Sequence, residues 1–286
     1  MNNEIAAVVV TFNRLKLLKK VINNIKNQTH KPDSIIIVNN SSTDGTTEWL
    51  EKQQGLDVIH QDNLGSSGGQ YTGFKAAYDK GFEFLWIMDD DVVPEKDCLE
   101  NLIKHHKNNK QVLAPLRYSI DNSPYINDTI KFNLNNPLKS IWTKIIDHDL
   151  LGEKMVRAEG ITFEGPFFHR TLIEKIGLPQ KNFFIYGDDS EFFIRANRAG
   201  FETYVVTDAK LNRQLPAPDL NNKFSWKNYY IIRNLIAIDK LHGNLIVKLL
   251  RKWAYLLVWL KRAKNKENRK TVLNAFLDGL TYKSEN

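Results

Sequence analysis

The chain has 286 residues, of which 42% are hydrophobic and 26% charged, so it is long enough for one large domain or two small ones with a sizeable core. Its formal net charge is +7, but residues 240–286 hold 11 Lys+Arg against 3 Asp+Glu, which leaves 29 against 30 for the rest of the chain. Its one cysteine, Cys98, excludes an internal disulfide and a zinc site built from cysteines, and it suits a reducing compartment.

The N-terminus, Met1-Asn-Asn-Glu4, lacks the basic flank of a signal peptide, and no apolar run reaches the ~20 residues that span a bilayer. We therefore expect a cytoplasmic protein. The positive charge belongs to the C-terminal tail, and a basic tail suits nucleic acid, an anionic membrane or simple solubility.

Short apolar runs alternate with helical patterns over the first 90 residues. We expect strands at residues 5–10, 34–38, 57–60 and 84–88, and helices at residues 15–25, 46–53 and 70–80. This alternation is typical of an α/β domain with a mostly parallel central sheet flanked by helices. In such sheets, ligands bind beyond the carboxyl ends of the strands.

A polar cluster follows each of these four strands. The clusters are Thr11-Phe-Asn-Arg14, Asn39-Asn40-Ser41-Ser42, Asn63 with Gly68-Gly69, and Asp89-Asp90-Asp91. Asn, Ser and Gly are common in ordinary turns, so each cluster alone has that simpler interpretation. Four clusters on one edge of a sheet favour a nucleotide-binding site.

The three aspartates at 89–91 stand in a row where a buried strand is expected to end. Ionised carboxylates so close together repel one another, and burying them unpaired is strongly unfavourable. A divalent cation would relieve this repulsion. The simpler alternative is an acidic turn that caps the following helix.

Two common nucleotide motifs are missing from the sequence. It has no G-x-x-x-x-G-K-[ST], and no G-x-G-x-x-G follows the first strand, so neither a P-loop nor a dinucleotide fingerprint is present. Without those glycine cradles, a diphosphate needs a metal to neutralise it. Mg²⁺ or Mn²⁺ suits this task, because each takes a few carboxylates together with phosphate oxygens.

The second half of the chain contains another acidic cluster. Residues 105–160 are expected to form a loop-rich insert, and a helix is expected at 171–176. An aromatic run then leads to Asp188, Asp189 and Glu191 at the start of a helix. Capping of that helix is the simpler interpretation, and it is compatible with a catalytic role.

Four segments of the chain resemble the family 2 glycosyltransferases. They are Val-Val-Val-Thr-Phe-Asn-Arg at 8–14, Val-Asn-Asn-Ser-Ser-Thr-Asp-Gly-Thr at 38–46, Asn-Leu-Gly-Ser-Ser-Gly-Gly at 63–69 and Trp-Ile-Met-Asp-Asp-Asp at 86–91. They occur in the expected order, and the resemblance covers roughly residues 4–240. The family has the GT-A fold and inverts the anomeric centre. The Ile-Met-Asp-Asp-Asp form is most similar to bacterial galactofuranosyl- and rhamnosyltransferases.

The resemblance implies a domain organisation and a substrate class. A GT-A catalytic domain would occupy residues 1–240, with a nucleotide-binding half at about 1–110 and an acceptor half at about 111–240. A basic amphipathic helical extension would follow at 241–286. The donor would be a UDP- or dTDP-sugar, first UDP-galactofuranose and alternatively dTDP-rhamnose. The acceptor would be a glycan or lipid-linked glycan of surface-polysaccharide synthesis.

The resemblance also assigns roles to residues. The nucleotide would contact Thr11, Asn13, Arg14, Asn40, Asn63, Gly69, Asp89 and Asp90. Mn²⁺ or Mg²⁺ would bind Asp89 and Asp91. In the family pattern, the second Asp of the Asp-Asp-x-Glu motif is the base that takes the acceptor hydroxyl proton, which is Asp189 here. Asp188 and Glu191 would orient the base or bind the acceptor sugar.

One departure from the family pattern concerns the metal. Related enzymes often supply a metal-ligand His after the base, but none of residues 170–241 is a His. Asp208 or Asn212 is then left as an oxygen ligand, with water as a further substitute. Alternatively, Lys210 or Arg213 neutralises the diphosphate directly.

Residues 226–234 match another segment of the family. Trp226 and Tyr230 would stack on sugar faces, while Arg233 would reach a phosphate or the acceptor. The simpler interpretation is a core helix with aromatic side chains.

The tail has the composition of an interfacial helix. From Leu245 to Leu260, apolar residues recur with helical period, and lysines and arginines stand between them. We expect residues 244–263 to contact an anionic membrane surface, on the inner face of the cell membrane. The alternative is a helix packed on the catalytic domain with a solvated basic face. The sequence leaves a homo-oligomer open.

Two other functions fit the sequence less well. A nucleic-acid-binding protein would use the basic tail, but the tail lacks a recognisable nucleic-acid module, so no nucleic-acid partner is expected. A nucleotidyltransferase also uses carboxylate-bound metal. It would carry a Gly-rich basic phosphate loop, of which Thr11-Phe-Asn-Arg14 is a poor version.

Overall fold

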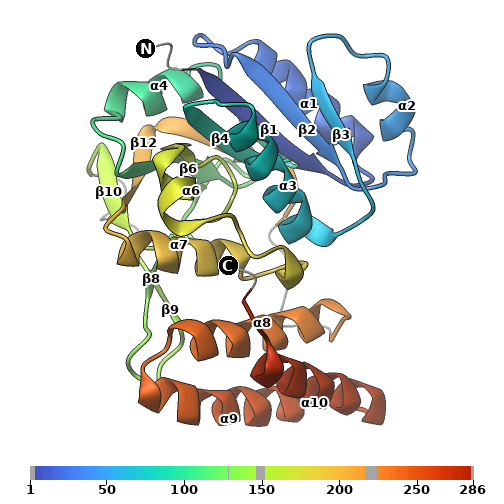
Figure 1. Cartoon of the computed structure of the whole chain (residues 1–286), viewed down its shortest axis with the longest axis vertical. Coiled ribbons are helices and arrows are strands. Elements are labelled where there is room, and N and C mark those ends of the chain that lie inside the picture. The colour runs from blue at the N-terminus through green and yellow to red at the C-terminus, as the bar shows by residue number, and fades with distance from the viewer. Residues whose placement is uncertain (1–3, 128, 146–151, 217–223, 285–286) are drawn as a thin grey trace.

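The structure, a computed structural model, describes residues 4–127, 129–145, 152–216 and 224–284. A twisted sheet with helices on both faces forms the larger part of the molecule, and three C-terminal helices form a separate layer at one end (Figure 1).

The first half of the chain builds the parallel part of the sheet, in the order β4-β1-β2-β3. Its strands are β1 (Ile5–Thr11), β2 (Ser34–Asn39), β3 (Asp57–His60) and β4 (Phe84–Asp89). The chain returns each time through α1 (Leu15–Lys26), α2 (Thr46–Leu50) or α3 (Gly65–Asp79). The carboxyl ends of these strands therefore share one edge, as the alternating pattern predicts.

The second half extends the sheet beyond β4 in the order β11-β6-β12-β10. The strands are β6 (Gln111–Tyr118), β10 (Met155–Ala158), β11 (Phe167–His169) and β12 (Glu202–Arg213), with β5 (Val92–Pro94) and β7 (Pro124–Tyr125) at the margins. β11 is antiparallel to both β4 and β6, whereas β12 is parallel to β6. β5 pairs with the end of β12, which brings Arg213 opposite Val92.

Each face of the sheet has its own buried core. The even-numbered residues of β1, such as Ala6 and Val8, pack in a cluster with α3, α7 (Asp188–Arg198) and α6 (Thr171–Ile176). Those of odd number, such as Ala7 and Val9, pack with α1 and α4 (Cys98–His105). Burial on both faces explains why β1 is apolar throughout instead of alternating.

The start of α3 differs from the expected helix at 70–80. The helix begins five residues earlier, at Gly65, and includes the glycine-rich segment that the sequence pattern places in a loop. A Cβ atom on Gly69 would lie 2.4 Å from Val10 Cγ1 and 2.8 Å from Asn40 Nδ2. The glycine therefore allows the helix to approach β1 and β2 closely, a use that local turn propensity does not reveal.

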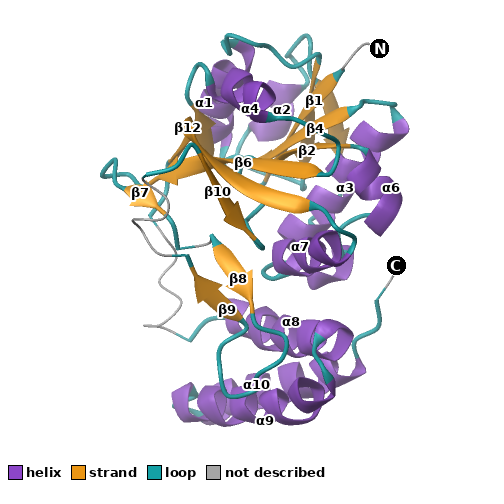
Figure 2. Ribbon diagram, turned by 90° about the vertical axis from the view of Figure 1, so that its left-hand side faces the viewer, coloured by secondary structure: helices purple, strands orange, loops and turns teal. Residues whose placement is uncertain are grey.

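The C-terminal helices are α8 (Lys227–His242), α9 (Leu245–Arg262) and α10 (Lys266–Thr281), and the last two form the helical extension expected at 241–286. They share one buried cluster that also takes in Phe183 and Ile194, before and within α7. The hairpin of β8 (Ile130–Phe132) and β9 (Trp142–Lys144) lies above them (Figure 2). α8 therefore packs with the tail helices as well as with the catalytic half of the chain.

A buried ion pair joins α8, α9 and the hairpin. Arg251 Nη1 lies 2.9 Å from Asp239 Oδ1, and both side chains are buried. Arg251 Nη2 also donates to the carbonyl oxygens of Asn133 at 2.7 Å and Asn136 at 2.9 Å. Burial raises the pKa of Asp239 to about 7, although Arg251 opposes this shift. These contacts support the alternative in which the tail packs on the rest of the protein.

Candidate active site

Three carboxylates meet where β4 ends. Asp89, Asp91 and Glu164 each offer an oxygen, and these oxygens lie within 4.8 Å of one another. Asp89 ends β4, Asp91 stands in the turn before β5, and Glu164 precedes Gly165. Gly165 has a φ of +96°, and a Cβ atom there would lie 2.6 Å from Pro115, so a glycine is needed for the chain to bring Glu164 to the strand end.

The negative charge in this cluster is only partly compensated. Burial raises the pKa of Asp89 well above its usual range, and repulsion from Asp91 and Glu164 raises it further. Asp89 Oδ1 accepts a hydrogen bond from Gln70 Nε2 at 2.9 Å, which is a neutral donor. An additional cation between the carboxylates would favour the ionised form of Asp89.

Arginines surround the other two members. Arg14 Nη1 lies 2.8 Å from Asp91 Oδ2, and Arg117 Nη1 lies 2.9 Å from Glu164 Oε2. Arg213 Nη2 is 3.7 Å from the other oxygen of Glu164. Three clustered carboxylates form the oxygen-rich set that Mg²⁺ and Mn²⁺ prefer, so the residues fit a divalent cation.

Glu164 is the carboxylate of this cluster that the sequence patterns did not identify. A weak signal was present, because it is an isolated acidic residue within the apolar run 161–168. Asp208 does not join the cluster, since its Oδ2 lies 2.9 Å from His105 Nε2 of α4. Asn212 Nδ2 lies 3.4 Å from Glu95 Oε1. The third carboxylate therefore comes from the segment before β11 and not from β12.

Asp90, the middle aspartate, turns into the protein instead of toward the open edge. It accepts hydrogen bonds from Thr11 Oγ1 at 2.7 Å and Phe12 N at 3.3 Å, and its Oδ1 lies 2.9 Å from Arg14 Nη1. Burial raises the pKa of Asp90 to about 6, against the opposing effects of Arg14 and Thr11. Thr11 and Asp90, both predicted to contact the nucleotide, are buried and bind each other, because an unpaired carboxylate there would be costly.

The predicted asparagines hold the neighbouring loops together. Asn13, at φ 54°, accepts a hydrogen bond from Thr43 N at 2.6 Å, and Asn63 accepts one from Gly65 N at 3.0 Å. The buried Asn40 donates to the Gly65 carbonyl at 3.0 Å and accepts from Gln61 at 2.6 Å. Gly69 is buried on the side of α3 that faces β1 and β2, where it allows close packing, and its contact with a nucleotide stays a prediction.

The second acidic pair begins α7. Asp188 is buried, whereas Asp189 is partly exposed and accepts a hydrogen bond from Ser190 N at 2.5 Å. Burial raises the pKa of Asp188 to about 6, although backbone N–H groups and the Ser67 hydroxyl oppose the shift. Repulsion from Asp188 is also one cause of the raised pKa of Asp89, so the two acidic clusters are close in space.

Glu191 is enclosed within the protein. Its carboxylate lies 2.8 Å from Arg195 Nη2 and 3.0 Å from His242 Nε2. Burial would raise the pKa of Glu191, but His242 and Arg195 outweigh it and lower the pKa. Both oxygens of Glu191 therefore serve a buried ion-pair network, and its contact with an acceptor stays a prediction.

The aromatic segment of α8 lies against the loop before α7. The Phe184 ring stacks on Tyr230 with centroids 4.8 Å apart, and Trp226 is 59% exposed. Arg233 Nη2 donates to the carbonyl oxygens of Asn182 at 2.7 Å and Phe183 at 2.9 Å. Trp226 is thus accessible to a sugar, whereas Arg233 binds the backbone before α7, and its contact with a phosphate or the acceptor stays a prediction.

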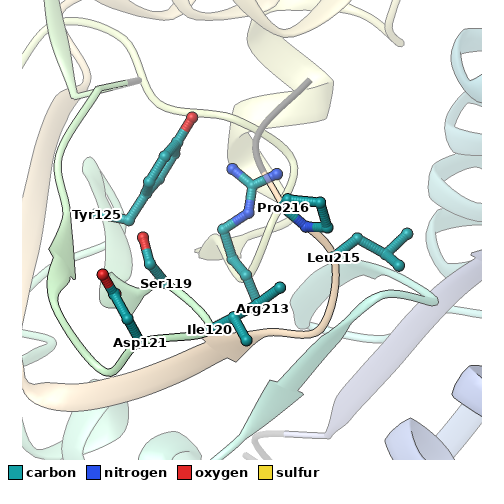
Figure 3. A pocket seen from close by; sticks show the side chains of 7 residues that line it. All are labelled: Ser119, Ile120, Asp121, Tyr125, Arg213, Leu215 and Pro216. Atoms are coloured by element: carbon teal, nitrogen blue, oxygen red, sulfur yellow. The ribbon is translucent and has the colours of Figure 1, made fainter. Parts of the chain in front are cut away.

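A pocket of about 360 Å³ lies beside the first cluster (Figure 3). It is lined by Ser119, Ile120, Asp121, Tyr125, Arg213, Leu215 and Pro216. The guanidinium carbon of Arg213 lies 4.4 Å from the centre of the Tyr125 ring, and the same side chain approaches Glu164. Gln214 N donates to the Asp91 carbonyl at 2.8 Å, which fixes this end of β12 to the acidic turn.

Comparisons with known proteins identify relatives of the chain. A model of the glycosyl transferase family 2 matches residues 6–176. Galactofuranosyltransferase GlfT1 of Mycobacterium tuberculosis is 28% identical over 224 residues, which cover 73% of this chain and 69% of that protein. The Mycolicibacterium smegmatis protein of the same name is 25% identical over 68% of this chain, and the chain spans 66% of its length. dTDP-rhamnosyl transferase RfbF of Shigella flexneri is 24% identical over 98% of this chain and 96% of that protein.

Solved structures share the fold. GalNAc-T7 with UDP, GalNAc and Mn²⁺ matches 95% of this chain and 54% of its own, with a TM-score of 0.67 and 12% identity. The mannosyltransferase PcManGT of Pyrobaculum calidifontis, with GDP-Man and Mn²⁺, matches 98% of this chain and 76% of its own, with a TM-score of 0.56 and 16% identity. Both are GT-A glycosyltransferases, so the predicted GT-A fold is confirmed. The chain belongs to glycosyltransferase family 2, and it is a glycosyltransferase.

Proposed function

We propose that the protein transfers a sugar with inversion from a nucleotide-sugar donor to a lipid-linked surface-polysaccharide acceptor. UDP-galactofuranose is the proposed donor and dTDP-rhamnose the alternative, which the names of the GlfT1 and RfbF relatives support. The observation that carries the proposal is the meeting of two acidic clusters at one edge of the sheet. One cluster suits a leaving diphosphate, and the other suits an attacking hydroxyl.

The first cluster would serve the leaving group. Asp89, Asp91 and Glu164 would hold Mn²⁺ or Mg²⁺, which when bound neutralises the charge that develops on the nucleoside diphosphate. Arg14, half-exposed beside Asp91, is placed to bind a phosphate oxygen by a charge-assisted hydrogen bond. The donor would occupy the half of the domain before about residue 110.

The second cluster would serve the acceptor. The acceptor oxygen attacks C1 of the donor sugar while the bond from C1 to the diphosphate oxygen breaks, and Asp189 takes the hydroxyl proton. Asp189 is the more exposed member of the pair, so it can reach an acceptor, whereas the buried Asp188 would orient it. Trp226 and the pocket beside Arg213 would bind acceptor sugars in the half from about residue 111.

We also propose that α9 rests on an anionic membrane surface. Val247, Arg251 and Trp259 form its buried side. Its opposite side carries large apolar side chains that are each more than half exposed, Ile246, Leu249, Leu250, Trp253 and Leu257. Such a contiguous exposed apolar patch needs a partner.

Charge favours an anionic lipid surface as that partner. Residues 240–286, which include α9, carry a net charge of +8. Among the described residues, no helix is long and apolar enough to cross a membrane. A lipid-linked acceptor would place the reaction beside such a surface, on its cytoplasmic side.

A donor screen tests the proposed reaction. We expect the protein to hydrolyse or transfer sugar from UDP-galactofuranose in the presence of Mn²⁺, measured by release of UDP. Turnover of dTDP-rhamnose instead would establish the alternative. A protein that turns over neither donor but binds nucleic acid with steep salt dependence would contradict the proposal.

Glu164→Gln tests the metal-binding role of the third carboxylate. Loss of one anionic ligand should weaken Mn²⁺ binding by about tenfold or more, which is ~1.4 kcal/mol or more. Isothermal calorimetry on the nucleotide-free protein measures this directly. Glu174→Gln, an exposed carboxylate paired with Arg170, is the matched control. Equal Mn²⁺ affinity in both variants would remove Glu164 from the site.

Asp189→Asn tests the base. The amide keeps the size of the carboxylate but cannot accept the proton, so transfer should fall by about 10²–10⁴-fold while the donor nucleotide still binds. Steady-state kinetics and calorimetry measure the two quantities. Asp79→Asn, on the exposed surface of α3, is the control. Near-normal turnover in Asp189→Asn would refute its role as base.

The double change Leu250→Glu and Leu257→Glu tests the membrane contact. Each residue would otherwise bury its side chain at the lipid interface, worth ~1.5–3 kcal/mol, so binding to phosphatidylglycerol vesicles should fall by well over tenfold. Leu138→Glu, a 93% exposed leucine in the hairpin loop, is the control. If the double variant still floats with vesicles like the control, or if the change only dissociates a dimer of the protein, the surface is not a membrane contact.

A further inference from the structure

The segment before the two aspartates of α7 has an unusual backbone. Phe184, Tyr186 and Gly187 have φ values of 63°, 67° and 84°. Glycine adopts this left-handed region readily, but residues with a Cβ atom avoid it. Such conformations persist only where the surrounding structure imposes them, and they cluster at functional sites.

A buried side chain of α8 holds the centre of this segment, beside Arg233, which binds its start. Asn234 is 1% exposed, and its Nδ2 donates to the carbonyl oxygens of Phe183 at 3.0 Å, Ile185 at 3.0 Å and Tyr186 at 2.6 Å. The backbone must curl for three carbonyls to face one amide nitrogen. A side chain without an N–H donor would leave these carbonyls without that partner.

The other side of the segment is fixed to α3. Ser67 N donates to the Phe184 carbonyl at 3.1 Å, and a Cβ atom on Gly65 would lie 2.1 Å from the same oxygen. The Ser67 hydroxyl also acts on Asp188, since it opposes the rise in the pKa of that carboxyl. Figure 1 shows the start of α3 on the side of the sheet layer that faces α8. The loop is therefore held between α8 and the helix that faces the first acidic cluster.

We propose that Asn234 is a positioning residue for transfer. It sets the loop conformation that directs the first turn of α7, and hence Asp188 and Asp189, toward the carboxylates at the end of β4. This inference rests on the proposed role of Asp189 as base. α7 itself does not depend on Asn234, because Phe192 and Phe193 anchor the helix in the core of the sheet.

The first test is Asn234→Ala. A shift of the base by about 1 Å is enough to lower kcat by roughly 10²-fold, while the dissociation constant of UDP or dTDP, whichever binds the wild type, should stay within about threefold. Asn228→Ala is the matched control, since Asn228 is a buried asparagine of the same helix whose side chain accepts a hydrogen bond from Ser225 N. It should retain normal kcat.

The second test is a rescue. Tyr186→Gly in the Asn234→Ala background lets the loop keep its positive φ without the clamp, so kcat should recover by about tenfold. A merely stabilising role for Asn234 predicts no such recovery. If Asn234→Ala does not fold, Asn234→Ser, which keeps one donor, is measured in its place with the same expectations.

Hydrogen exchange separates this inference from the assignment of the base. In Asn234→Ala, the amides of Ile185 and Ser67 should exchange faster, while those of β1 and β4 stay protected. Normal turnover in Asp189→Asn would refute the base whatever Asn234 does. Unchanged exchange and unchanged kcat in Asn234→Ala, or an equal loss of kcat and nucleotide binding, would overturn the positioning role.

Discussion

Repulsion between carboxylates at the end of β4 is the constraint on which the site depends. Two unit charges a little under 5 Å apart repel by about 3 kcal/mol at an effective dielectric constant of ~20. An oxygen of Asp89 lies within this distance of oxygens of Asp91 and Glu164, and the charge of Asp188 repels it as well. Neighbouring side chains partly neutralise this charge. Arg14 binds Asp90 and Asp91, and Arg117 binds Glu164. The neutral Gln70 donates a hydrogen bond to Asp89. A fold that concentrates negative charge in this way is suited to a cationic or phosphate-bound partner.

Patterns local in sequence predicted the strands well, because buried parallel strands are apolar throughout and end in polar turns. The ranges 57–60 and 171–176 agree with β3 and α6, and β1 and β2 extend one residue further than expected. The predicted start of α3 was wrong. The five glycines and serines at 65–69 resemble a loop, and only the close approach of the helix to β1 explains why they are helical. The helical extension expected at 241–286 is divided into α9 and α10, and the sequence pattern did not locate the break between them.

The sequence predicted only those site residues that lie next to one another in the chain. The aspartates at 89–91 and 188–189 follow apolar runs and were identified, although their roles stay predictions. Glu164 lies beside these aspartates because β11, which follows it, is placed between β4 and β6 in the sheet. The residues around Glu164 do not indicate that strand order. The sequence likewise did not reveal that Arg233 binds the Phe183 carbonyl and Glu191 binds His242, because these partners lie about 50 residues away.

The ion pair between Arg14 and Asp91 has a consequence for cation binding. Arg14 binds Asp91 and Asp90 at once, so it also ties the end of β1 to the end of β4. Any divalent ion that takes the Asp91 carboxylate competes with this guanidinium. The free energy of the existing pair is therefore subtracted from the affinity of the three carboxylates for a metal. The displaced guanidinium would gain a new partner only if an anion arrives, so metal and phosphate should bind with positive cooperativity.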